Sequence, residues 1–363
     1  MKILVVGGAG YVGSHSVKLL RSLGHTVWVY DNLSRGHRES VPQEILIEGN
    51  LTDRALLMRV MQEKEIDAVM HFAAYALVGE SVQHPAMYYQ NNVTATFELL
   101  EAMRAAGVWR FVFSSTTATY GQPDKMPISE DTPQNPINPY GFTKLVVERA
   151  LSDYAHAYGF GVAALRYFNA SGASADASIG EDHDPESHLI PIVLQVALGQ
   201  RDSISVFGKD YPTPDGTCIR DYIHVEDLAT AHVSALLKLK PSGVMQMNLG
   251  SGVGHSVLEV IEACRKVTGH AIPIVYSDRR PGDPACLIAN SNLAQSTLAW
   301  KPKYIEIEGI VETAWRWHQS HPKGYATEYT DCPQSLVRKQ SKAIVLNRLP
   351  EDAVEQLSES PSR

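Results

Sequence analysis

The chain has 363 residues, of which 44% are hydrophobic and 20% are charged, and its net charge is −8 at pH 7. This composition is typical of a globular protein large enough for one large or two medium domains. The acidic balance argues against a nucleic-acid partner, because no basic tract offsets it. No apolar run is long enough to span a bilayer, and no secretory signal precedes the first apolar segment. We therefore expect no membrane partner and a cytoplasmic location.

The cysteine and histidine patterns give no sign of a metal site. The four cysteines are widely spaced and form no CxxC pair, which favours reduced thiols over a disulfide framework or a zinc site. The 14 histidines are scattered and show no HxxxH spacing and no His/Asp cluster with ligand spacing. We therefore expect no bound metal.

A glycine-rich turn follows the first predicted strand, residues 2–7. Gly7, Gly10 and Gly13 form a GxxGxxG pattern between this strand and a helix that runs through Arg21. Residues without a Cβ let the backbone approach a pyrophosphate, and the N–H groups of the helix N-terminus bind the anion. The alternative is a tight turn that binds nothing, which the motif alone does not exclude.

The second predicted strand, residues 25–30, favours the binding interpretation. Asp31 follows this strand, about 20 residues beyond the glycines, where a carboxylate hydrogen-bonds the adenosine ribose hydroxyls. A carboxylate at this position repels a 2′-phosphate. We therefore predict NAD rather than NADP as the cofactor, although Arg35 lies nearby and weakens that preference.

The segments that follow alternate between strand and helix. Strands are predicted at 44–48, 66–72, 109–115 and 161–168, and helices up to Lys64, at 85–106 and at 140–158. Thr52 or Asp53 is the predicted cap of the first of these helices. Alternation with short connections predicts an α/β fold with a doubly wound parallel Rossmann sheet, whose ligands bind at the carboxyl ends of the strands.

The pattern changes after Asn169, and we divide the chain at that point. Residues 1–170 form the predicted NAD-binding Rossmann domain, and residues 171–322 form a smaller C-terminal α/β lobe that mainly binds substrate. In this lobe we predict helices at 189–198, 225–240 and 258–268, and a strand at 245–249. The tail, residues 323–363, is polar, lacks periodicity and is expected to be poorly ordered.

Tyr140 and Lys144 lie four residues apart on the predicted helix 140–158, so both side chains project from one face. A phenol ionises near pH 10, and a fixed ammonium neighbour favours the phenolate. Such a pair can act as a base on a sugar hydroxyl, although the spacing alone also occurs by chance on solvated helices.

The run 114–121, SSTTATYG, leaves the fifth predicted strand at its ligand end. Its hydroxyls commonly serve ordinary turns, but this position favours a substrate contact.

Arginines on predicted loops of the second lobe indicate an anionic ligand. Arg220 follows the loop 210–219, and Arg279 and Arg280 lie just before Asp283. The planar guanidinium binds oxyanions bidentately, which suits a diphosphate. For any one of these arginines a solvated surface position is the commoner alternative.

Several ordered stretches carry a family resemblance between residue 2 and about residue 317. They are GGAGYVGSH (7–15), DNLS (31–34), HFAA (71–74), FSSTTATYG (113–121), NPYGFTK (138–144), RYFNASGA (166–173), IGEDHDPESHLIP (179–191), VFGKDYPTPDGTCIRDYIHVEDL (206–228) and RRPGDPA (279–285). Together they resemble the extended short-chain dehydrogenase/reductase family and, within it, the UDP-glucose 4-epimerases. The resemblance implies an isomerase that reversibly epimerises UDP-galactose and UDP-glucose at C4, through a 4-keto intermediate with transient hydride transfer to tightly bound NAD. It also implies a homodimer, with the helices 85–106 and 140–158 at its interface.

The resemblance implies roles for three catalytic residues. Tyr140 removes the proton of the sugar 4-hydroxyl, and Thr116 hydrogen-bonds the 4-oxygen. Lys144 binds the nicotinamide ribose and lowers the pKa of Tyr140 toward neutrality while NAD is oxidised. Besides Tyr140 and Lys144, the residues matched to NAD binding are Gly7, Gly10, Tyr11, Val12, Asp31, Asn32, Asn50, Leu51, Phe72, Ala73, Ala74, Asn91, Ser114 and Tyr167. Besides Thr116 and Tyr140, those matched to UDP-sugar binding are Asn169, His188, Leu189, Val206, Phe207, Arg220, Tyr222, Arg280, Asp283 and Cys286.

Three positions depart from the family pattern. Ala76 stands where many relatives carry a lysine near the NAD phosphates, and His188 replaces a frequent asparagine beside the diphosphate. Cys286 lies where a bulky tyrosine closes the sugar pocket of relatives restricted to UDP-glucose and UDP-galactose. A small residue there leaves room for an N-acetyl group, so we expect UDP-GlcNAc and UDP-GalNAc to be interconverted as well.

Three alternative functions stay open. The nearest is another UDP-sugar 4-epimerase, acting on UDP-xylose/arabinose or UDP-glucuronate, which relative turnover on a panel of UDP-sugars distinguishes. The second is a simple dehydrogenase or a sugar 4,6-dehydratase, and a dehydratase needs an acid/base pair that Thr116-Thr117-Ala118 lacks. The third is a non-catalytic NAD sensor, which has no need of Tyr140, Lys144 and Thr116 together.

Overall fold

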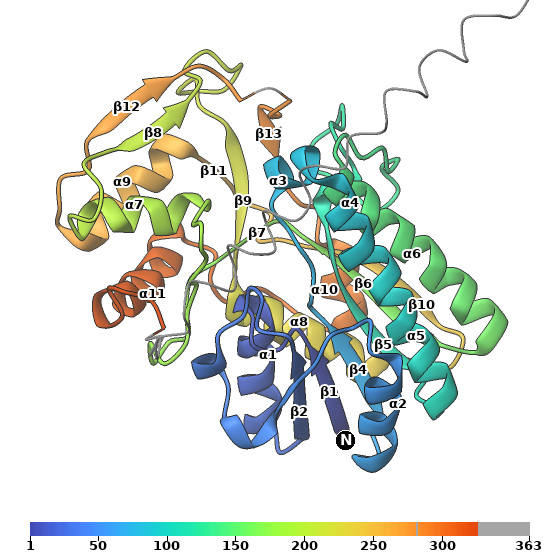
Figure 1. The fold of residues 1–363 in the computed structure, drawn as a ribbon. Helices are drawn as coiled ribbons and strands as arrows, with labels where there is room; N and C mark the ends of the chain where they lie inside the picture. The colour runs from blue at the N-terminus through green and yellow to red at the C-terminus, as the bar shows by residue number, and fades with distance from the viewer. Residues whose placement is uncertain (281, 326–363) are drawn as a thin grey trace, which may run out of the picture. The chain divides into compact units, whose positions relative to one another are not determined.

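A seven-stranded parallel sheet forms the centre of the protein, which we describe from a computed structural model that places residues 1–280 and 282–325 (Figure 1). Its strands are β1 (Lys2–Val6), β2 (Thr26–Asp31), β3 (Leu46–Glu48), β4 (Ala68–His71), β5 (Arg110–Thr116), β6 (Gly161–Tyr167) and β10 (Val244–Leu249). They lie in the order β10-β6-β5-β4-β1-β2-β3, and each neighbouring pair is parallel. The strand order reverses between β1 and β4, where doubly wound sheets bind their ligands. The predicted Rossmann sheet is confirmed.

The sheet is buried on both faces, because successive side chains of its strands enter two different cores. Ile3 and Val5 of β1 pack in the first core, and Leu4 and Val6 pack in the second, as the two-residue period of a strand requires. The first core is covered by α1 (Tyr11–Ser22), α8 (Val225–Lys238) and α10 (Asn292–Leu298). The second core is covered by α2 (Arg54–Glu63), α5 (Ala95–Ala106) and α6 (Pro139–Tyr158). Burial on both faces explains why β1 is a continuous apolar run.

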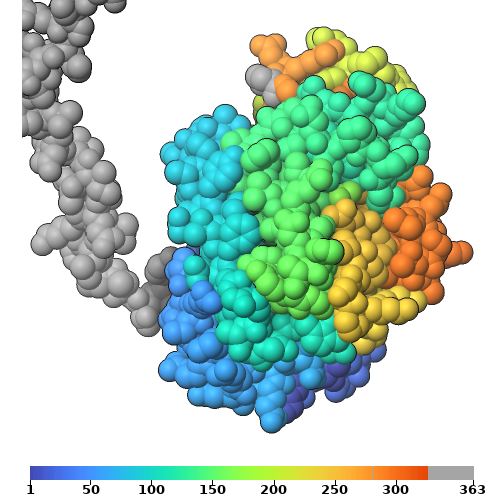
Figure 2. Space-filling model, turned by 90° about the vertical axis from the view of Figure 1, so that its right-hand side faces the viewer, coloured from blue at the N-terminus to red at the C-terminus, as the bar shows by residue number. Residues whose placement is uncertain are grey.

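The helix predicted at 85–106 contains a π-helical turn. Its parts are α4 (Pro85–Tyr88), η3 (Tyr89–Thr94) and α5, and a short helix that the sequence did not predict, α3 (Val78–Gln83), precedes them. In the π turn, the Asn92 amide donates to the Tyr75 carbonyl and accepts from the Tyr75 N–H, both at 2.9 Å. This pair of bonds ties the wider turn to the loop after β4, and π turns of this kind are frequent at functional sites. Figure 2 shows the segment 78–106 beside α6 on one face of the molecule.

Other predicted elements differ from the structure by a few residues at their ends. Asp53, not Thr52, caps α2, and its carboxylate accepts a hydrogen bond from the Leu56 N–H at 3.0 Å. The third strand begins at Leu46 because a 3-10 turn, η2 (Gln43–Ile45), occupies the preceding residues. Two further 3-10 turns are η1 (Arg38–Ser40) and η4 (Thr117–Thr119).

The C-terminal helices build a third core. It joins α7 (Leu189–Ala197), α9 (Val257–Thr268) and α11 (Ile307–Ser320) to the parallel strand pair β8 (Ile204–Phe207) and β12 (Ile274–Ser277). A small sheet centred on β9 (Ile219–His224) adds β7 (Asn169–Ser171), β11 (Gly254–Ser256) and β13 (Cys286–Leu287). Among the helices of the described residues, none combines the length and the hydrophobicity of a membrane span.

Residues 225–249, which we assigned to the second lobe, contribute to the large sheet and its first core. Helix α8 packs on the large sheet, and β10 extends that sheet by pairing with β6 from Val244 opposite Val162 to Leu249 opposite Tyr167. The partner of β10 lies about 80 residues earlier in the chain, so no local pattern could reveal the pairing. The domain boundaries themselves stay a prediction, since residues Met1–Tyr325 form one compact unit. The predicted tail beyond Tyr325 lies outside the described residues.

Candidate active site

A cavity of about 1370 Å³ opens at the carboxyl ends of β1, β4, β5 and β6. Its sheet wall consists of residues from 6–13, 30–36, 49–51, 72–84, 91, 116–121, 137–140 and 167–170. Its loop wall consists of residues from 181–192, 201–207, 218–222, 257 and 280–287, without the undescribed residue 281. Pockets for one small ligand enclose about 300–1,000 Å³, so this cavity has room for a dinucleotide and a second ligand.

The glycine turn forms the part of the sheet wall that fits a pyrophosphate. Gly7 adopts φ +75°, and a Cβ at this position would lie 2.3 Å from the Ala73 nitrogen. A Cβ on Gly13 would lie 2.3 Å from the Gly7 carbonyl oxygen. Gly10 is the N-cap of α1 and has no side chain to accept a capping hydrogen bond. The N–H groups of the first turn therefore remain available to a ligand in the cavity. The turn therefore offers backbone donors and close access to an anion, as NAD requires.

Asp31 ends β2 beside this turn. Its two carboxylate oxygens accept hydrogen bonds from the Ala9 N–H at 3.0 Å and the Leu33 N–H at 2.9 Å. Burial raises the pKa of Asp31, and these backbone hydrogen bonds lower it. Each oxygen has a further lone pair for a ribose hydroxyl. Arg35 pairs with Glu80 at 2.8 Å, so its charge is already compensated and Asp31 can exclude a 2′-phosphate.

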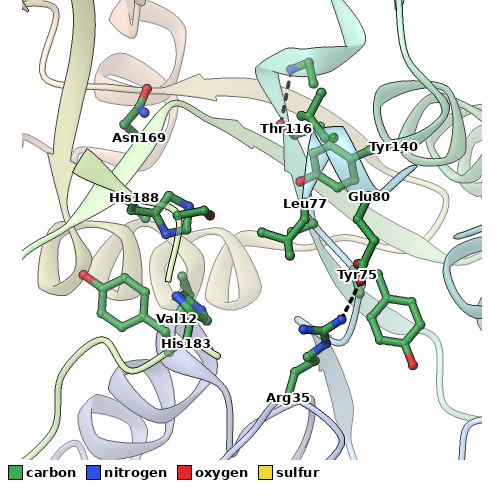
Figure 3. Close-up of a pocket in the computed structure, with 18 of the residues that line it drawn as sticks. Val12, Arg35, Tyr75, Leu77, Glu80, Thr116, Tyr140, Asn169, His183 and His188 are labelled. Carbon is green, nitrogen blue, oxygen red and sulfur yellow. Dashed lines mark hydrogen bonds and ion pairs between the residues drawn. The ribbon is translucent and has the colours of Figure 1, made fainter. Parts of the chain in front are cut away.

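Tyr140 lies in the first turn of α6, close to the end of β5. Asn138 caps the helix, and its side-chain oxygen accepts from the Gly141 N–H at 2.8 Å. A Cβ on residue 141 would lie 2.4 Å from the Ala118 carbonyl oxygen, so glycine allows the turn after β5 to approach α6. The Thr116 hydroxyl accepts from the Ala118 N–H at 3.2 Å. Thr116 and Tyr140 thereby lie next to each other on the sheet wall (Figure 3).

Lys144 lies behind Tyr140 in the protein interior. Its ammonium donates to the Ser114 carbonyl at 2.8 Å and lies 4.7 Å from the centre of the Phe113 ring. Burial lowers the pKa of Lys144 to about 7, against a smaller opposite effect of Glu148. Burial raises the pKa of Tyr140 above its usual value, Tyr167 adds to the rise, and a hydrogen bond with Thr116 opposes it. The phenol therefore needs a further positive charge nearby to ionise near pH 7.

The loop wall presents cationic and aromatic groups to the cavity. The Arg220 guanidinium donates to the Asp283 carboxylate, and its side chain is 12% exposed. The Arg280 guanidinium lies 4.1 Å from the centre of the Phe207 ring, a cation–π arrangement. The Tyr222 side chain is buried at the same wall. This combination suits an anionic group attached to a planar base.

Most residues matched to the site lie on the cavity wall, and four do not. Ser114, Lys144, Val206 and Cys286 are absent from the lining of the cavity as the described residues form it. The Ser114 hydroxyl bonds the Tyr167 hydroxyl at 2.7 Å, and Val206 is buried in the third core. Cys286 pairs with Ile219 in β13. The contact of Cys286 with the sugar stays a prediction, and the next residue, Leu287, lines the cavity.

Sequence reasoning missed a buried ion pair that holds α6 against the sheet. The Arg166 guanidinium of β6 donates to both Glu148 oxygens, at 2.6 to 3.1 Å, and the two side chains are 2% and 0% exposed. The Ser115 hydroxyl and the Gln134 amide donate to the same carboxylate. Glu148 lies one helical turn beyond Lys144, so its spacing could have suggested that it faces the protein interior. Its partner Arg166 is on a different element and could not be identified from spacing.

The expectation that no histidine cluster has ligand spacing is also wrong. Glu181, His183, Glu186 and His188 each place one potential ligand atom within 4.8 Å of the others. All four residues lie on the loop wall and belong to the motif at 179–191. Their spacing, E-x-H-x-x-E-x-H, differs from the helical HxxxH pattern because the segment is a loop.

Comparisons with known proteins agree with this geometry. Residues 3–250 match the model of the NAD dependent epimerase/dehydratase family. A UDP-glucose 4-epimerase of Halalkalibacterium halodurans is 54% identical over 91% of this chain and 99% of its own. The crystal structure of UDP-glucose 4-epimerase from Brucella ovis in complex with NAD is 50% identical, with a TM-score of 0.84, and covers 87% of this chain and 97% of its own. The structure from Bifidobacterium longum in complex with NAD⁺ and UDP is 39% identical, with a TM-score of 0.85, and covers 90% of this chain and 100% of its own.

These matches extend over most of the chain and include the glycine turn, Tyr140 and Lys144. They confirm the resemblance that the sequence motifs indicated. The chain belongs to the NAD dependent epimerase/dehydratase family and, within it, to the UDP-glucose 4-epimerases.

Proposed function

We propose that the protein is an isomerase that reversibly converts UDP-galactose into UDP-glucose at C4, with NAD as a retained cofactor. The observation that carries the proposal is the position of Tyr140 and Thr116 in one cavity with both the glycine turn and the loop-wall arginines. Solved relatives bind NAD and UDP. One cavity thus serves cofactor, nucleotide and sugar together.

Bound NAD would supply a hydride acceptor and donor at the nicotinamide and a positive charge on the oxidised ring. The phenolate oxygen of Tyr140 takes the proton of the sugar 4-hydroxyl while C4 loses its hydride, which leaves a 4-keto sugar. The Thr116 hydroxyl hydrogen-bonds the 4-oxygen and fixes its position. After the keto sugar rotates in the cavity and presents its other face, Tyr140 returns the proton and C4 regains the hydride on its opposite face. The cycle consumes no second substrate.

The loop wall holds the nucleotide while the sugar rotates. Arg220 and Arg280 neutralise the diphosphate, and Phe207 and Tyr222 provide apolar surface for the nucleoside. A guanidinium binds a phosphate through two parallel N–H donors. Strong contacts to UDP and few contacts to the sugar allow rotation without release, which the separation of this wall from Tyr140 supports.

Incubation of the purified enzyme with UDP-galactose, without added NAD, tests the proposal. We expect UDP-glucose to accumulate to an equilibrium mixture, observed by proton NMR of the anomeric signals. A simple dehydrogenase would require added NAD in stoichiometric amounts, and a dehydratase would release a 4-keto-6-deoxy sugar. Higher turnover on UDP-xylose or UDP-glucuronate than on UDP-galactose would instead support another UDP-sugar 4-epimerase.

We also propose a homodimer and a cytoplasmic location. Tyr89 and Phe142, on the segment 78–106 and on α6, form an edge-to-face pair at 6.4 Å and are 40% and 45% exposed. The segments that carry them, 78–106 and α6, lie side by side on the face seen in Figure 2, where a second copy could cover these two rings. Cys218, Cys264 and Cys286 are free thiols, as in a reducing compartment. Sedimentation equilibrium at micromolar concentration checks the dimer, and a monomer there would refute it.

A further inference from the structure

The loop that connects β7 to α7 brings four potential metal ligands together. Glu181, His183, Glu186 and His188 direct one oxygen or nitrogen atom each into a common space, with all four atoms within 4.8 Å of one another. The two imidazole rings lie 5.3 Å apart between centres. Figure 3 shows both histidines on the side of the pocket opposite Tyr140, so the cluster is separate from the reacting groups.

The side chains approach each other closely without forming hydrogen bonds of normal direction. The Nδ1 atom of His183 lies 3.2 Å from the Glu181 Oε1 atom, and the Nδ1 atom of His188 lies 2.6 Å from it. Nevertheless, Glu181 Oε1 and His183 Nδ1 are both buried without a hydrogen-bond partner within the described part of the chain. An imidazolium–carboxylate pair would align its N–H with an oxygen lone pair. The two buried atoms are therefore free to accept a further bond, as ligands of an ion would.

Other contacts leave the inward atoms of this cluster available. The Oε1 atom of Glu186 accepts from the backbone N–H groups of Ser187 and His188, at 2.7 and 2.8 Å, so its Oε2 atom is directed to His183 at 3.7 Å. Glu181 is only 4% exposed. Burial of its carboxylate is unfavourable unless positive charge compensates it, and the groups nearest to its Oε1 atom are the two imidazole nitrogens at 2.6 and 3.2 Å. The two carboxylates, at 4% and 5% exposed, are thus enclosed by the protein, and the His183 and His188 side chains, at 30% and 47% exposed, close the cluster from the cavity side.

The donor set and its dimensions match a tetrahedral transition-metal site. Two imidazole nitrogens and two carboxylate oxygens are ligands of Zn²⁺ and related divalent ions, and structural zinc sites have four ligands. Metal–ligand bonds of about 2.0–2.2 Å separate neighbouring ligands of a tetrahedron by about 3.3–3.6 Å. Three measured separations between the inward atoms are 2.6, 3.2 and 3.7 Å, around this range.

We propose that Glu181, His183, Glu186 and His188 bind one divalent transition-metal ion, of which Zn²⁺ fits best. His188 is the N-cap of α7, and the next residue, Leu189, lines the cavity. The ion fixes the 181–188 loop and the start of α7, and so holds this part of the loop wall in place. It takes no part in proton or hydride transfer, and the inference does not depend on which sugar the enzyme converts.

Metal analysis of the full-length holoenzyme tests the site directly. After dialysis against a chelator, the protein is titrated with Co²⁺, and Zn²⁺ content after reloading is measured by mass spectrometry. We expect one ion per chain and the intense visible absorption of tetrahedral Co²⁺. Zinc X-ray absorption should show nitrogen and oxygen ligands that include two imidazoles. Sulfur ligation, octahedral coordination by water, or no ion retained would overturn the proposal.

Variants locate the ion. His183→Asn and Glu181→Gln preserve size, and each should raise the Kd for Co²⁺ by at least about 100-fold. His270→Asn, at an exposed histidine far from the cluster in sequence, should leave the Kd unchanged. If the variants unfold, the X-ray absorption spectrum of the unmodified protein still shows whether two imidazoles and oxygen ligands bind the ion. Unchanged Co²⁺ affinity in the folded His183→Asn variant would show that the ion lies elsewhere.

Discussion

Two arginine–carboxylate pairs on opposite sides of the cavity differ in how completely the protein encloses them. Arg166 and Glu148, under the sheet wall, are 2% and 0% exposed, and three side chains, those of Ser115, Gln134 and Arg166, donate to the carboxylate. Arg220 and Asp283, on the loop wall, are 12% and 29% exposed and line the cavity. The same chemistry thus serves two purposes: the enclosed pair fixes a helix, and the open pair can exchange its carboxylate for a phosphate. In the proposed function, the enclosed pair therefore supports the helix that carries Tyr140, and the open pair serves binding of the diphosphate.

Replacement of the proposed base should affect turnover alone and give the largest effect. Tyr140→Phe removes the hydroxyl that takes and returns the proton, so kcat should fall by about 10²–10⁴-fold. Initial rates of UDP-glucose formation measure this loss. Retained NAD, quantified after denaturation, and KM should change little. Tyr158→Phe on the exposed end of the same helix is the control and should keep full activity. Full activity in Tyr140→Phe would defeat the mechanism.

The enclosed pair should control stability. Glu148→Gln leaves Arg166 buried without its counter-charge, which costs about 3–5 kcal/mol of unfolding free energy. Urea denaturation monitored by circular dichroism gives the value. Glu308→Gln, which breaks the exposed pair with Lys266, should cost about 0–1 kcal/mol. The double variant Glu148→Leu/Arg166→Met should recover much of the loss, since an apolar pair removes both charges.

The open pair should control substrate affinity. Arg220→Met removes charge-assisted hydrogen bonds to the diphosphate, each worth about 1.5–3 kcal/mol, so KM should rise by about 10–100-fold while stability changes little. Steady-state kinetics and calorimetric titration with UDP measure the effect. Arg279→Met, at a neighbouring arginine that pairs with Asp210 outside the cavity, is the matched control. If Arg220→Met lost as much stability as Glu148→Gln and left KM unchanged, the proposed difference in role between the two pairs would be refuted.

The buried ammonium of Lys144 predicts a pH effect on the sheet wall. Its pKa in the folded protein is lowered to about 7 from a usual value of 10.5. Between these values the unfolded chain binds a proton that the folded chain does not, so the free energy of unfolding rises with pH. Below pH 7 the full cost of burial is present. The stability advantage of cofactor-free Lys144→Met over the unmodified protein should therefore shrink from pH 7 to 9, by at most about 1.4 kcal/mol per pH unit. An advantage independent of pH would contradict the assignment.

The two walls also differ in how much of them the sequence could predict. The glycine turn, Asp31 and Tyr140 are short-range patterns, and all of them lie on the sheet wall, whereas Lys144 donates to the Ser114 carbonyl away from the lining. Glu148 could not be matched to Arg166, because the two residues meet only when α6 packs on β6. Local spacing carries no information about such a contact.

On the loop wall, the site residues were predicted from motifs shared with relatives. These motifs do not show which side chains face the cavity, because that depends on contacts between residues far apart in the sequence. The strand pairing of β13 with β9 turns Leu287, and not Cys286, toward the cavity. The cluster of Glu181, His183, Glu186 and His188 forms because a loop folds back on itself, and helical spacing rules do not apply there. Side chains that act from loops are therefore the harder ones to find in the sequence.

A substitution at Leu287 tests whether this residue, rather than Cys286, borders the sugar and affects sugar specificity. Leu287 packs against the small apolar cluster that contains Tyr120 and Phe168 and lines the cavity, so we propose that it borders the sugar. If the enzyme also epimerises UDP-GlcNAc, Leu287→Tyr should lower that turnover relative to UDP-galactose by about tenfold or more, the scale on which a pocket discriminates added bulk. Cys286→Tyr, one residue away but off the cavity lining, should leave the ratio within about twofold. The reverse order of the two effects would restore Cys286 as the residue that selects the sugar.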